Sequence, residues 1–285
     1  MIKTILAPID GSPASFAAFD YTLKLAQLLE AAVNVLFVVD QRKTQVPFMY
    51  AGGAYDITYE RIYIPPDQEL RDFYDRIKHD LQEFAHRCTA RCEQSAGELG
   101  VDLSSEVVEG YPADVIEKHA LGADLVIIGQ HGENAGTKEE TIGSTTEELV
   151  RKSPRPVIVC PEEAKIPEKI LFPYDGSRSA ENCLQFYTAH LSKKIPNLVF
   201  LCAECEEDSE PYQNEIEYLT QHSVNVKLIQ QEENPIQAVD TMIEAEKPDL
   251  IMLGSHGRNK LVTYLLGSTT IHVIRKSKLP VLIVY

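Results

Sequence analysis

The residues best suited to bind a ligand lie in one stretch near the end of the chain, residues 249–268. An apolar run at residues 250–253 is short enough to be a buried strand of a parallel sheet. Gly254 and Gly257 follow this run, and after nine further residues Gly267 precedes a helical pattern. Glycines let backbone N–H groups approach an anion closely, and a helix N-terminus favours negative charge. A strand, a glycine-bearing loop and a helix start in this order indicate a phosphate-binding site.

Side chains in the same stretch support this interpretation. Ser268 and Thr269 offer hydroxyl groups, while Arg258 and Lys260 add positive charge to a chain whose formal net charge is −16. The alternative is an ordinary loop between a strand and a helix, in which the glycines serve turns only. Short glycine motifs do not by themselves separate the two interpretations.

The pattern occurs twice. Residues 124–144 repeat the strand, the Gly-x-x-Gly pair and the closing Gly-Ser of residues 249–268. Elsewhere the first half reads TILAPIDGS and RKSPRPVIV where the second half reads KILFPYDGS and RKSKLPVLIV. A repeat of this extent predicts two homologous domains, residues 1–162 and 167–285. Strand and helix patterns alternate in both, so the predicted fold class is α/β, with two tandem doubly wound parallel sheets.

An aspartate follows the first predicted strand of each half. In the first half, a strand at residues 2–9 ends at Asp10, and a helix that runs to about Glu30 leads to a second strand at residues 33–39. Open α/β sheets bind ligands at the carboxyl ends of their strands, so Asp10 is placed to accept a hydrogen bond from a nucleotide. The alternative role for Asp10 is that of a turn or helix-capping aspartate.

These motifs together resemble the universal stress protein family. The likeness rests on Gly-x2-Gly-x9-Gly-Ser after a strand, with Asp-Gly-Ser upstream, and it covers both halves. It implies a fold like that of adenine-nucleotide α-hydrolases and, in many but not all members, bound ATP or AMP, with or without Mg²⁺. By this resemblance the nucleotide-binding residues of the second half are Asp175, Cys202, Leu253, Gly254, Gly257, Arg258, Gly267, Ser268 and Thr269. The weaker set in the first half is Asp10, Val38, Gly129, Gly132, Gly143, Ser144 and Thr145.

Composition excludes several classes of partner. The acidic balance argues against nucleic acid or an anionic membrane, because phosphate-rich surfaces need a basic face. No apolar run approaches the roughly 20 residues of a membrane span. Strand pattern begins at Ile2 with no signal peptide ahead of it, so a cytoplasmic protein is expected.

The cysteines and histidines do not form a clear catalytic or metal site. Six cysteines are too sparse for a disulfide scaffold. Cys202 and Cys205 have the spacing of a redox or zinc half-site, but the acidic residues that follow would raise their thiol pKa values. No second pair completes a zinc site, so no metal is expected. His131 and His256 lie between motif glycines, where orienting the loop is the alternative to acid–base work, and no catalytic residue is assigned.

The first half carries an insertion. Counting from Asp10 to Gly129 and from Asp175 to Gly254 shows that the second half is shorter by 40 residues (119 − 79), and nearly all of the difference lies after the second strand. The insertion comprises an irregular, tyrosine-rich segment at 41–66 and most of a long amphipathic helix. A segment of this length and apolar content is expected to cover the first-half cleft or to contact a protein partner.

The two glycine loops also differ. The first has one more residue between its second and third glycines, and it carries Glu133, Glu139 and Glu140 where the second has Arg258 and Lys260. Carboxylates near a triphosphate repel it unless a metal intervenes. The second half is therefore predicted to be the tighter nucleotide site, although its Glu233-Asn234-Pro235 departs from the Gly-Tyr-Pro of the first half.

Three functions remain open from sequence alone. The leading hypothesis is a nucleotide-binding regulatory protein of the stress response; the alternatives are a nucleotide-free adaptor and a weak ATP hydrolase. Neither a P-loop nor a Gly-x-Ser-x-Gly elbow is present, which disfavours the hydrolase. The last strands of the halves, residues 156–160 and 280–284, are apolar edge candidates that are expected to pair. The chain would then be an internal pseudo-dimer, with a homodimer as a further alternative.

Overall fold

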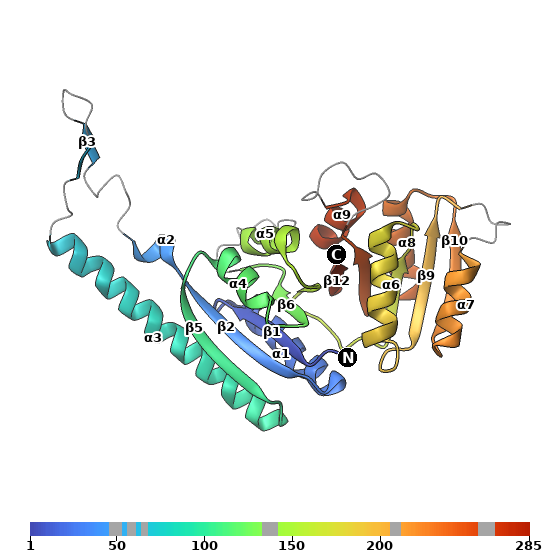
Figure 1. The fold of residues 1–285 in the computed structure, drawn as a ribbon, viewed down its shortest axis with the longest axis horizontal. Helices are drawn as coiled ribbons and strands as arrows, with labels where there is room; N and C mark the ends of the chain where they lie inside the picture. The colour runs from blue at the N-terminus through green and yellow to red at the C-terminus, as the bar shows by residue number, and fades with distance from the viewer. Residues whose placement is uncertain (46–52, 56–60, 64–67, 133–141, 206–211, 256–265) are drawn as a thin grey trace.

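The computed structural model describes the chain except for residues 46–52, 56–60, 64–67, 133–141, 206–211 and 256–265 (Figure 1). Its main feature is a ten-stranded sheet. The strands of the first half are β1 (Thr4–Ile9), β2 (Ala32–Asp40), β5 (Leu103–Gly110), β6 (Leu125–Gly129) and β7 (Val157–Cys160). Those of the second half are β8 (Lys169–Pro173), β9 (Asn197–Ala203), β10 (Asn225–Gln231), β11 (Leu250–Gly254) and β12 (Val281–Val284).

Each half contributes five strands in the same order. The sheet reads β10-β9-β8-β11-β12-β7-β6-β1-β2-β5, so β8 corresponds to β1, β9 to β2 and β11 to β6. Within each half, all strand pairs of this ten-stranded sheet are parallel. The central strands are buried on both sides and rich in Val, Ile and Leu, as strands covered by helices on both faces must be. The predicted α/β fold class is confirmed.

The halves meet through their last strands. β12 pairs antiparallel with β7, with Val281 opposite Val159 and Leu282 opposite Ile158. This confirms the prediction that the terminal edge strands pair. Because strands are parallel within a half and antiparallel across this seam, the carboxyl ends of the two sets of strands lie at opposite edges of the sheet.

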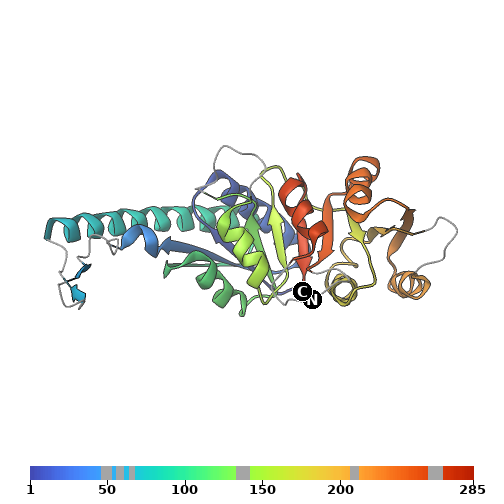
Figure 2. The ribbon, with the colours of Figure 1, turned by 90° about the horizontal axis from the view of Figure 1, so that it is seen from above.

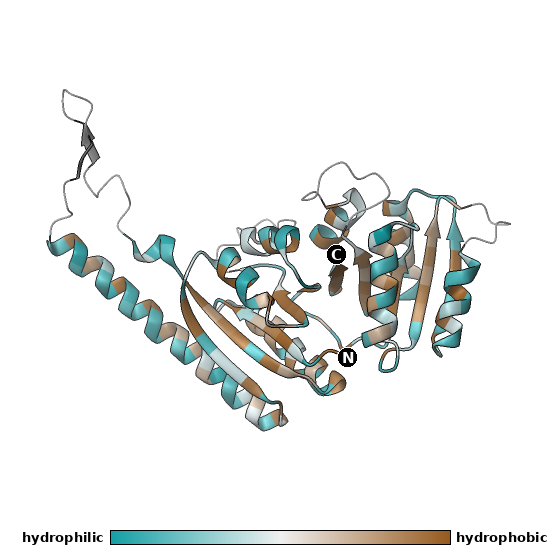
Figure 3. Ribbon diagram, viewed as in Figure 1, coloured by the Kyte–Doolittle hydropathy of each residue, from teal (hydrophilic) through white to brown (hydrophobic). Residues whose placement is uncertain are grey.

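Two helical layers enclose the sheet (Figures 1 and 2). One core cluster joins the sheet to α1 (Pro13–Leu29), α3 (Gln68–Leu99), α6 (Arg178–His190) and α7 (Gln213–Gln221). The other joins its opposite face to α4 (Pro112–Ala120), α5 (Ser144–Lys152), α8 (Pro235–Glu246) and α9 (Ser268–Lys276). Hydrophobic residues concentrate on the strands (Figure 3). None of the described helices combines the length and the apolar character that a membrane span requires.

Helix starts follow from local sequence. Ser12 caps α1, because its hydroxyl accepts the backbone N–H of Ser15 at 3.2 Å, and Pro13 fits the first turn. Ser177 caps α6 in the same way, accepting from Ala180 at 3.3 Å. The two Asp-Gly-Ser motifs therefore each end a strand and begin a helix, as their spacing predicts.

The missing residues of the second half lie where the count placed them. α3 has 32 residues, whereas α7, at the corresponding point of the second half, has nine. Figure 1 shows the N-terminal end of α3 extending beyond the other helices of the first half. The segment at 41–66 is more regular than expected: it begins with α2 (Gln41–Thr44) and contains an antiparallel pair, β3 (Gly53–Tyr55) and β4 (Arg61–Tyr63). Much of the rest of this segment lies outside the described residues, so its role stays a prediction.

Side chains reinforce the seam on the face that carries α5 and α9. The Gln130 amide, 7% exposed, donates to the carbonyl of Ile274 in α9 at 2.9 Å. The Tyr285 hydroxyl donates to the carbonyl of Val150 in α5 at 2.6 Å. Glu147 accepts from Arg151 of its own helix at 2.8 Å and lies 3.5 Å from Arg275 of the other half. The halves thus share a sheet, a core and a polar network.

This sharing predicts cooperative unfolding. Leu282 is fully buried at the seam, so Leu282→Ala should lower the free energy of unfolding by about 2–5 kcal/mol. Because both halves pack on β12, urea denaturation followed by circular dichroism should show one transition that shifts as a whole. Leu228 on the outer strand β10 is 39% exposed, and Leu228→Ala should cost less than about 1 kcal/mol. Two separate transitions, only one of which moves in Leu282→Ala, would contradict this account.

Candidate functional site

A cavity of about 280 Å³ opens at the carboxyl ends of β1, β2 and β6 in the first half. Parallel strands place loop residues from distant parts of the chain together at this edge. Each of the seven residues predicted for the first half lines the cavity: Asp10, Val38, Gly129, Gly132, Gly143, Ser144 and Thr145. Apolar side chains of β1 and β2, among them Ile9, Leu36 and Phe37, complete its wall. The cavity therefore combines an apolar surface with a glycine loop and a helix start.

Close backbone approach explains the glycines of this site. A Cβ atom on Gly132 would lie 2.9 Å from Oδ2 of Asp10, and one on Gly143 would lie 3.3 Å from the Gly132 nitrogen. A Cβ on Gly129 would lie 3.0 Å from the carbonyl oxygen of Ala14 in α1. Side chains at these positions would push the loop, the aspartate and the helix apart. The absence of side chains is what lets the glycine loop meet Asp10.

Asp10 takes part in a turn as well as in the cavity wall. Its Oδ1 accepts the backbone N–H of Ser12 at 3.0 Å, the turn role that the sequence left as the alternative. The hydrogen bond orients the carboxylate, and the same side chain lines the cavity. The two roles are compatible, because a carboxylate has more acceptor positions than one N–H uses.

The start of α5 is tied to the end of β6. The Gly143 N–H donates to the Gln130 carbonyl at 2.9 Å, and the Thr146 hydroxyl donates to the Gly129 carbonyl at 2.9 Å. Gly143 occupies the N-cap position without a side-chain cap, and Ser144 and Thr145 line the cavity. The first turn of a helix has backbone N–H groups without helical partners, and these favour an anion.

Two cations at the cavity were missed by sequence reasoning. Arg42 and Lys43 lie in α2, directly after β2, and both line the cavity. The sequence feature that predicts a role for these two residues is their position immediately after the carboxyl end of a predicted strand. Comparing the charges of the two glycine loops alone therefore left out the positive charge that the first half draws from α2.

Arg42 is held by Asp40. Its Nε lies 2.9 Å and 3.0 Å from the two carboxylate oxygens, and its Nη2 lies 2.6 Å from Oδ2. Burial acts to raise the pKa of Asp40, but the hydrogen bonds and the positive charge of Arg42 outweigh it and leave that pKa below its ordinary value. Asp40 is therefore ionised at neutral pH and fixes the guanidinium at the rim of the cavity.

The insertion supplies another wall of the cavity. Leu81 and Phe84 of α3 line it, and the Phe84 ring meets Phe37 edge to face with centroids 6.0 Å apart. Gly11 has φ +86°, and a Cβ there would lie 2.5 Å from the Phe84 ring. The long helix thus packs directly over the Asp-Gly-Ser turn.

In the second half a tyrosine covers the corresponding turn. A Cβ on Gly176 would lie 3.2 Å from the Tyr212 ring, and Tyr212 meets Tyr174 edge to face at 4.8 Å. Asp175 accepts the N–H of Ser177 at 2.9 Å, as Asp10 does with Ser12. In the second half the Asp-Gly-Ser turn is therefore covered by the ring of Tyr212, the residue that precedes α7, whereas in the first half it is covered by the long helix α3.

The described part of the second glycine loop repeats the first. The Thr270 hydroxyl donates to the Gly254 carbonyl at 3.1 Å, and the Gly267 N–H donates to the Ser255 carbonyl at 3.1 Å. Leu253 is buried at the end of β11, and Ser268 and Thr269 begin α9. Gly257, Arg258, Lys260 and His256 lie outside the described residues, as do Glu133, Glu139 and Glu140. The predicted inequality between the loops thus rests on residues that the structure does not describe.

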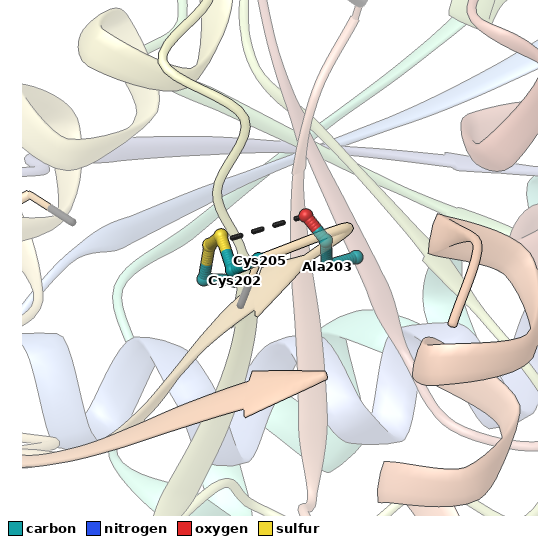
Figure 4. The surroundings of a disulfide bond; sticks show 3 residues. All are labelled: Cys202, Ala203 and Cys205. Carbon is teal, nitrogen blue, oxygen red and sulfur yellow. Dashed lines mark hydrogen bonds between the residues drawn. A yellow bond between two sulfur atoms is a disulfide. The ribbon is translucent and has the colours of Figure 1, made fainter. Parts of the chain in front are cut away.

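The strand register shows which residues of β2 and β9 occupy corresponding positions in the two halves. Pro8 lies opposite Leu36, and Pro173 lies opposite Leu201. Counting onward, Val38 corresponds to Ala203, one residue after the predicted Cys202. Cys202 corresponds instead to Phe37, and its sulfur is bonded to that of Cys205 (Figure 4). The spacing of this pair is also that of a redox or zinc half-site. Among the described residues, no cluster of three or more His, Cys, Asp or Glu side chains has an arrangement that could hold a metal ion.

The fold and the site define a class: a doubly wound α/β protein with a glycine loop and a helix start at the carboxyl end of its central strands. The sequence profile of the universal stress protein family matches residues 1–161 and 201–285. The chain belongs to the universal stress protein family.

Relatives of tandem length support this assignment. A universal stress protein of Synechocystis sp. is 26% identical over 298 residues, which cover 99% of each chain. One from Mycobacterium tuberculosis is 23% identical over 98% of this chain and 94% of its own. The crystal structure of a universal stress protein from Archaeoglobus fulgidus matches with a TM-score of 0.76 at 21% identity, covering 99% of this chain and 97% of that one, which shows the shared fold.

The packing of α3 over the first turn predicts a matched pair of glycine variants. Gly11 and Gly100 both have positive φ, but a Cβ on Gly100 meets open space. Gly100→Ala should cost about 1–2 kcal/mol of unfolding free energy from backbone strain alone. Gly11→Ala should cost a further 1–3 kcal/mol or so, because its Cβ displaces the Phe84 ring. Urea denaturation of both variants measures the difference.

The contact with Phe84 can be tested separately. In a Phe84→Ala background, Gly11→Ala should lose most of its extra cost, because the ring it displaces is gone. Equal costs for Gly11→Ala in both backgrounds would show that the contact does not matter.

Proposed function

We propose that this protein is an adenine-nucleotide-binding regulatory protein that holds ATP or AMP, with or without Mg²⁺, in the clefts at the carboxyl ends of its strands. The observation that carries the proposal is the first-half cavity. It joins an apolar wall from β1 and β2 to the glycines that follow β6, a helix start and two cations. An adenosine moiety suits the apolar wall, and phosphates suit the loop and helix start.

The assignment of individual residues is part of the proposal. In the first half, Asp10 and Val38 would hold the adenosine moiety, while Gly132, Gly143 and the start of α5 would hold the phosphates. In the second half, Asp175, Gly257, Gly267 and Ser268 are proposed for the same roles, with Ala203 in place of Cys202 by register. The family resemblance and the lining of the first cavity support this arrangement.

The second half is proposed as the tighter site, because Arg258 and Lys260 bring positive charge to its loop. The support is weaker than the sequence implied, since Arg42 and Lys43 supply cations to the first half. The domain boundaries are proposed as 1–162 and 167–285, with the connection between the halves after β7 and ahead of β8.

Hydrolysis is the second candidate function. His131 lines the first cavity beside the glycine loop, where it could exchange a proton with a bound nucleotide or with water. Incubation with ATP in excess over the protein separates the hydrolase from the binding protein, because only an enzyme gives multiple turnovers. A nucleotide-free adaptor would bind neither ATP nor AMP in titration and would carry neither through purification.

Two valine substitutions locate the sites. Gly132→Val should abolish binding in the first half, because its side chain collides with Asp10. Gly257→Val should abolish binding in the second half by blocking backbone approach to the phosphates. Calorimetric titration of ATP and AMP into each variant and the wild type measures the outcome. If Gly132→Val removes the tighter site and Gly257→Val leaves it intact, the proposed preference for the second half is wrong.

The cations of α2 give an independent test of the first half. Lys43→Gln should weaken ATP binding there by about fivefold to tenfold, equivalent to roughly 1–1.4 kcal/mol, and AMP less, because AMP carries less charge. The loss should shrink at high salt, since screening already reduces the contribution of Lys43. Lys24→Gln, at an exposed position of α1, is the charge-matched control. Equal effects of the two variants would show that net charge, and not the position of Lys43, governs binding.

A further inference from the structure

Cys202 and Cys205 form a disulfide at the carboxyl end of β9, with Cα atoms 6.0 Å apart (Figure 4). Cys202 is the penultimate residue of β9, and Cys205 is the second residue after the strand. The other four cysteines are free and buried. We propose that this pair is a reversible thiol–disulfide site that reacts with small disulfides and thiols.

The disulfide spans the turn that follows β9, residues 202–205, and we refer to this disulfide-bridged turn as the latch. The ladder between β9 and β10 ends where Ala203 meets Gln231. Glu204 then takes a left-handed conformation, φ 56°, which is uncommon for a residue with a side chain. Beyond it, the Glu204 N–H donates to the Glu233 carbonyl and the Cys205 N–H donates to the Gln231 carbonyl, each at 3.1 Å. The disulfide holds this turn in place and so extends the contact between β9 and β10 past the ladder.

The two sulfur atoms differ in access, which sets the order of reaction. Cys202 is 1% exposed, whereas Cys205 is partly exposed and the least buried of the six cysteines. The Cys205 thiolate attacks one sulfur of a small disulfide, forms a mixed disulfide and releases the first small thiolate. Cys202 then loses its proton and attacks the Cys205 sulfur, which releases the second small thiol. The protein loses two hydrogens and two electrons, and the small disulfide becomes two thiols.

Local charge selects the class of reagent. Glu204, Glu232 and Glu233 are exposed around the turn. A negative field of this kind concentrates cations and repels anions. A cationic disulfide such as cystamine therefore suits the site better than anionic glutathione disulfide.

The α3 cysteines provide an internal control. Cys88 and Cys92 are one helical turn apart and buried, and both remain thiols. Burial raises the pKa of Cys92 to about 12 and also raises the pKa of Cys88, so neither thiol ionises readily. A nearby pair of cysteines is therefore not sufficient for disulfide formation in this chain.

The test is a redox titration of the full-length chain. The protein is equilibrated in buffers of cystamine and cysteamine, quenched with acid, unfolded and alkylated, and its intact mass is measured. Reducing buffers should give six alkylated cysteines and oxidising buffers four, with peptide mapping assigning the protected pair to Cys202 and Cys205. The Cys88→Ala variant should keep the transition with one alkylated cysteine fewer, and Cys205→Ser should lose it. Six alkylated cysteines in every buffer, a mixed disulfide that never closes, or a bridge between chains would each overturn the proposal.

Two further measurements separate a specific latch from incidental oxidation. Hydrogen exchange should be faster in the reduced protein at the amides of Glu204 and Cys205, and unchanged at the corresponding end of β2, Val39 and Asp40. Oxidation by cystamine should be faster than by glutathione disulfide by roughly an order of magnitude at low salt, and the two rates should converge as salt rises. Unchanged exchange at this turn, or equal rates at low salt, would count against the latch.

Discussion

Close approach at three glycines around the carboxyl ends of β1 and β6 is the constraint on which the site depends. Gly132 lies against the Asp10 carboxylate, Gly143 lies against Gly132, and Gly129 lies against α1. None of these positions has room for a Cβ without displacing its neighbour. Because these three positions carry no side chains, a ligand in the cavity can approach the backbone closely. The strand order and the capped helices serve to bring these glycines together.

Different elements cover the Asp-Gly-Ser turns of the two halves. In the first half, α3 brings Phe84 over Gly11 and Leu81 over the cavity. In the second, Tyr212 reaches Gly176 from the start of a much shorter helix. The first-half cavity is thus walled by a helix, α3, whose counterpart in the second half is much shorter, and α2, which begins the same insertion, adds two cations to the cavity. The two halves therefore share the strand order and the glycine motif and differ in the connection after the second strand.

Much of this organisation could be predicted from the sequence, because it depends on local patterns that repeat. Apolar runs that alternate along the chain with helical patterns predicted the strands. The Asp-Gly-Ser motifs predicted the capped helices, and the apolar last strands predicted the pairing of the two halves. What escaped prediction depends on tertiary placement. Arg42 and Lys43 lie in a four-residue helix directly after β2. A helix this short has no hydrophobic periodicity from which its position beside the cavity could be predicted. The register that aligns Val38 with Ala203 also escaped prediction, because sequence spacing alone does not fix strand register to one residue. The bond between Cys202 and Cys205 depends on how the chain turns after β9, which composition does not reveal.

The seam between β7 and β12 has a consequence for how the protein behaves at low abundance. Two separate subunits joined by such edge strands would part on dilution, because their association depends on concentration. Here residues 161–168 connect the strand that ends the first half to the strand that begins the second. A connection this short holds the halves at an effective concentration on the order of millimolar, however few copies are present. The placement of the carboxyl ends of the two sets of strands at opposite ends of the sheet is therefore a fixed property of each molecule and does not vary with its expression level.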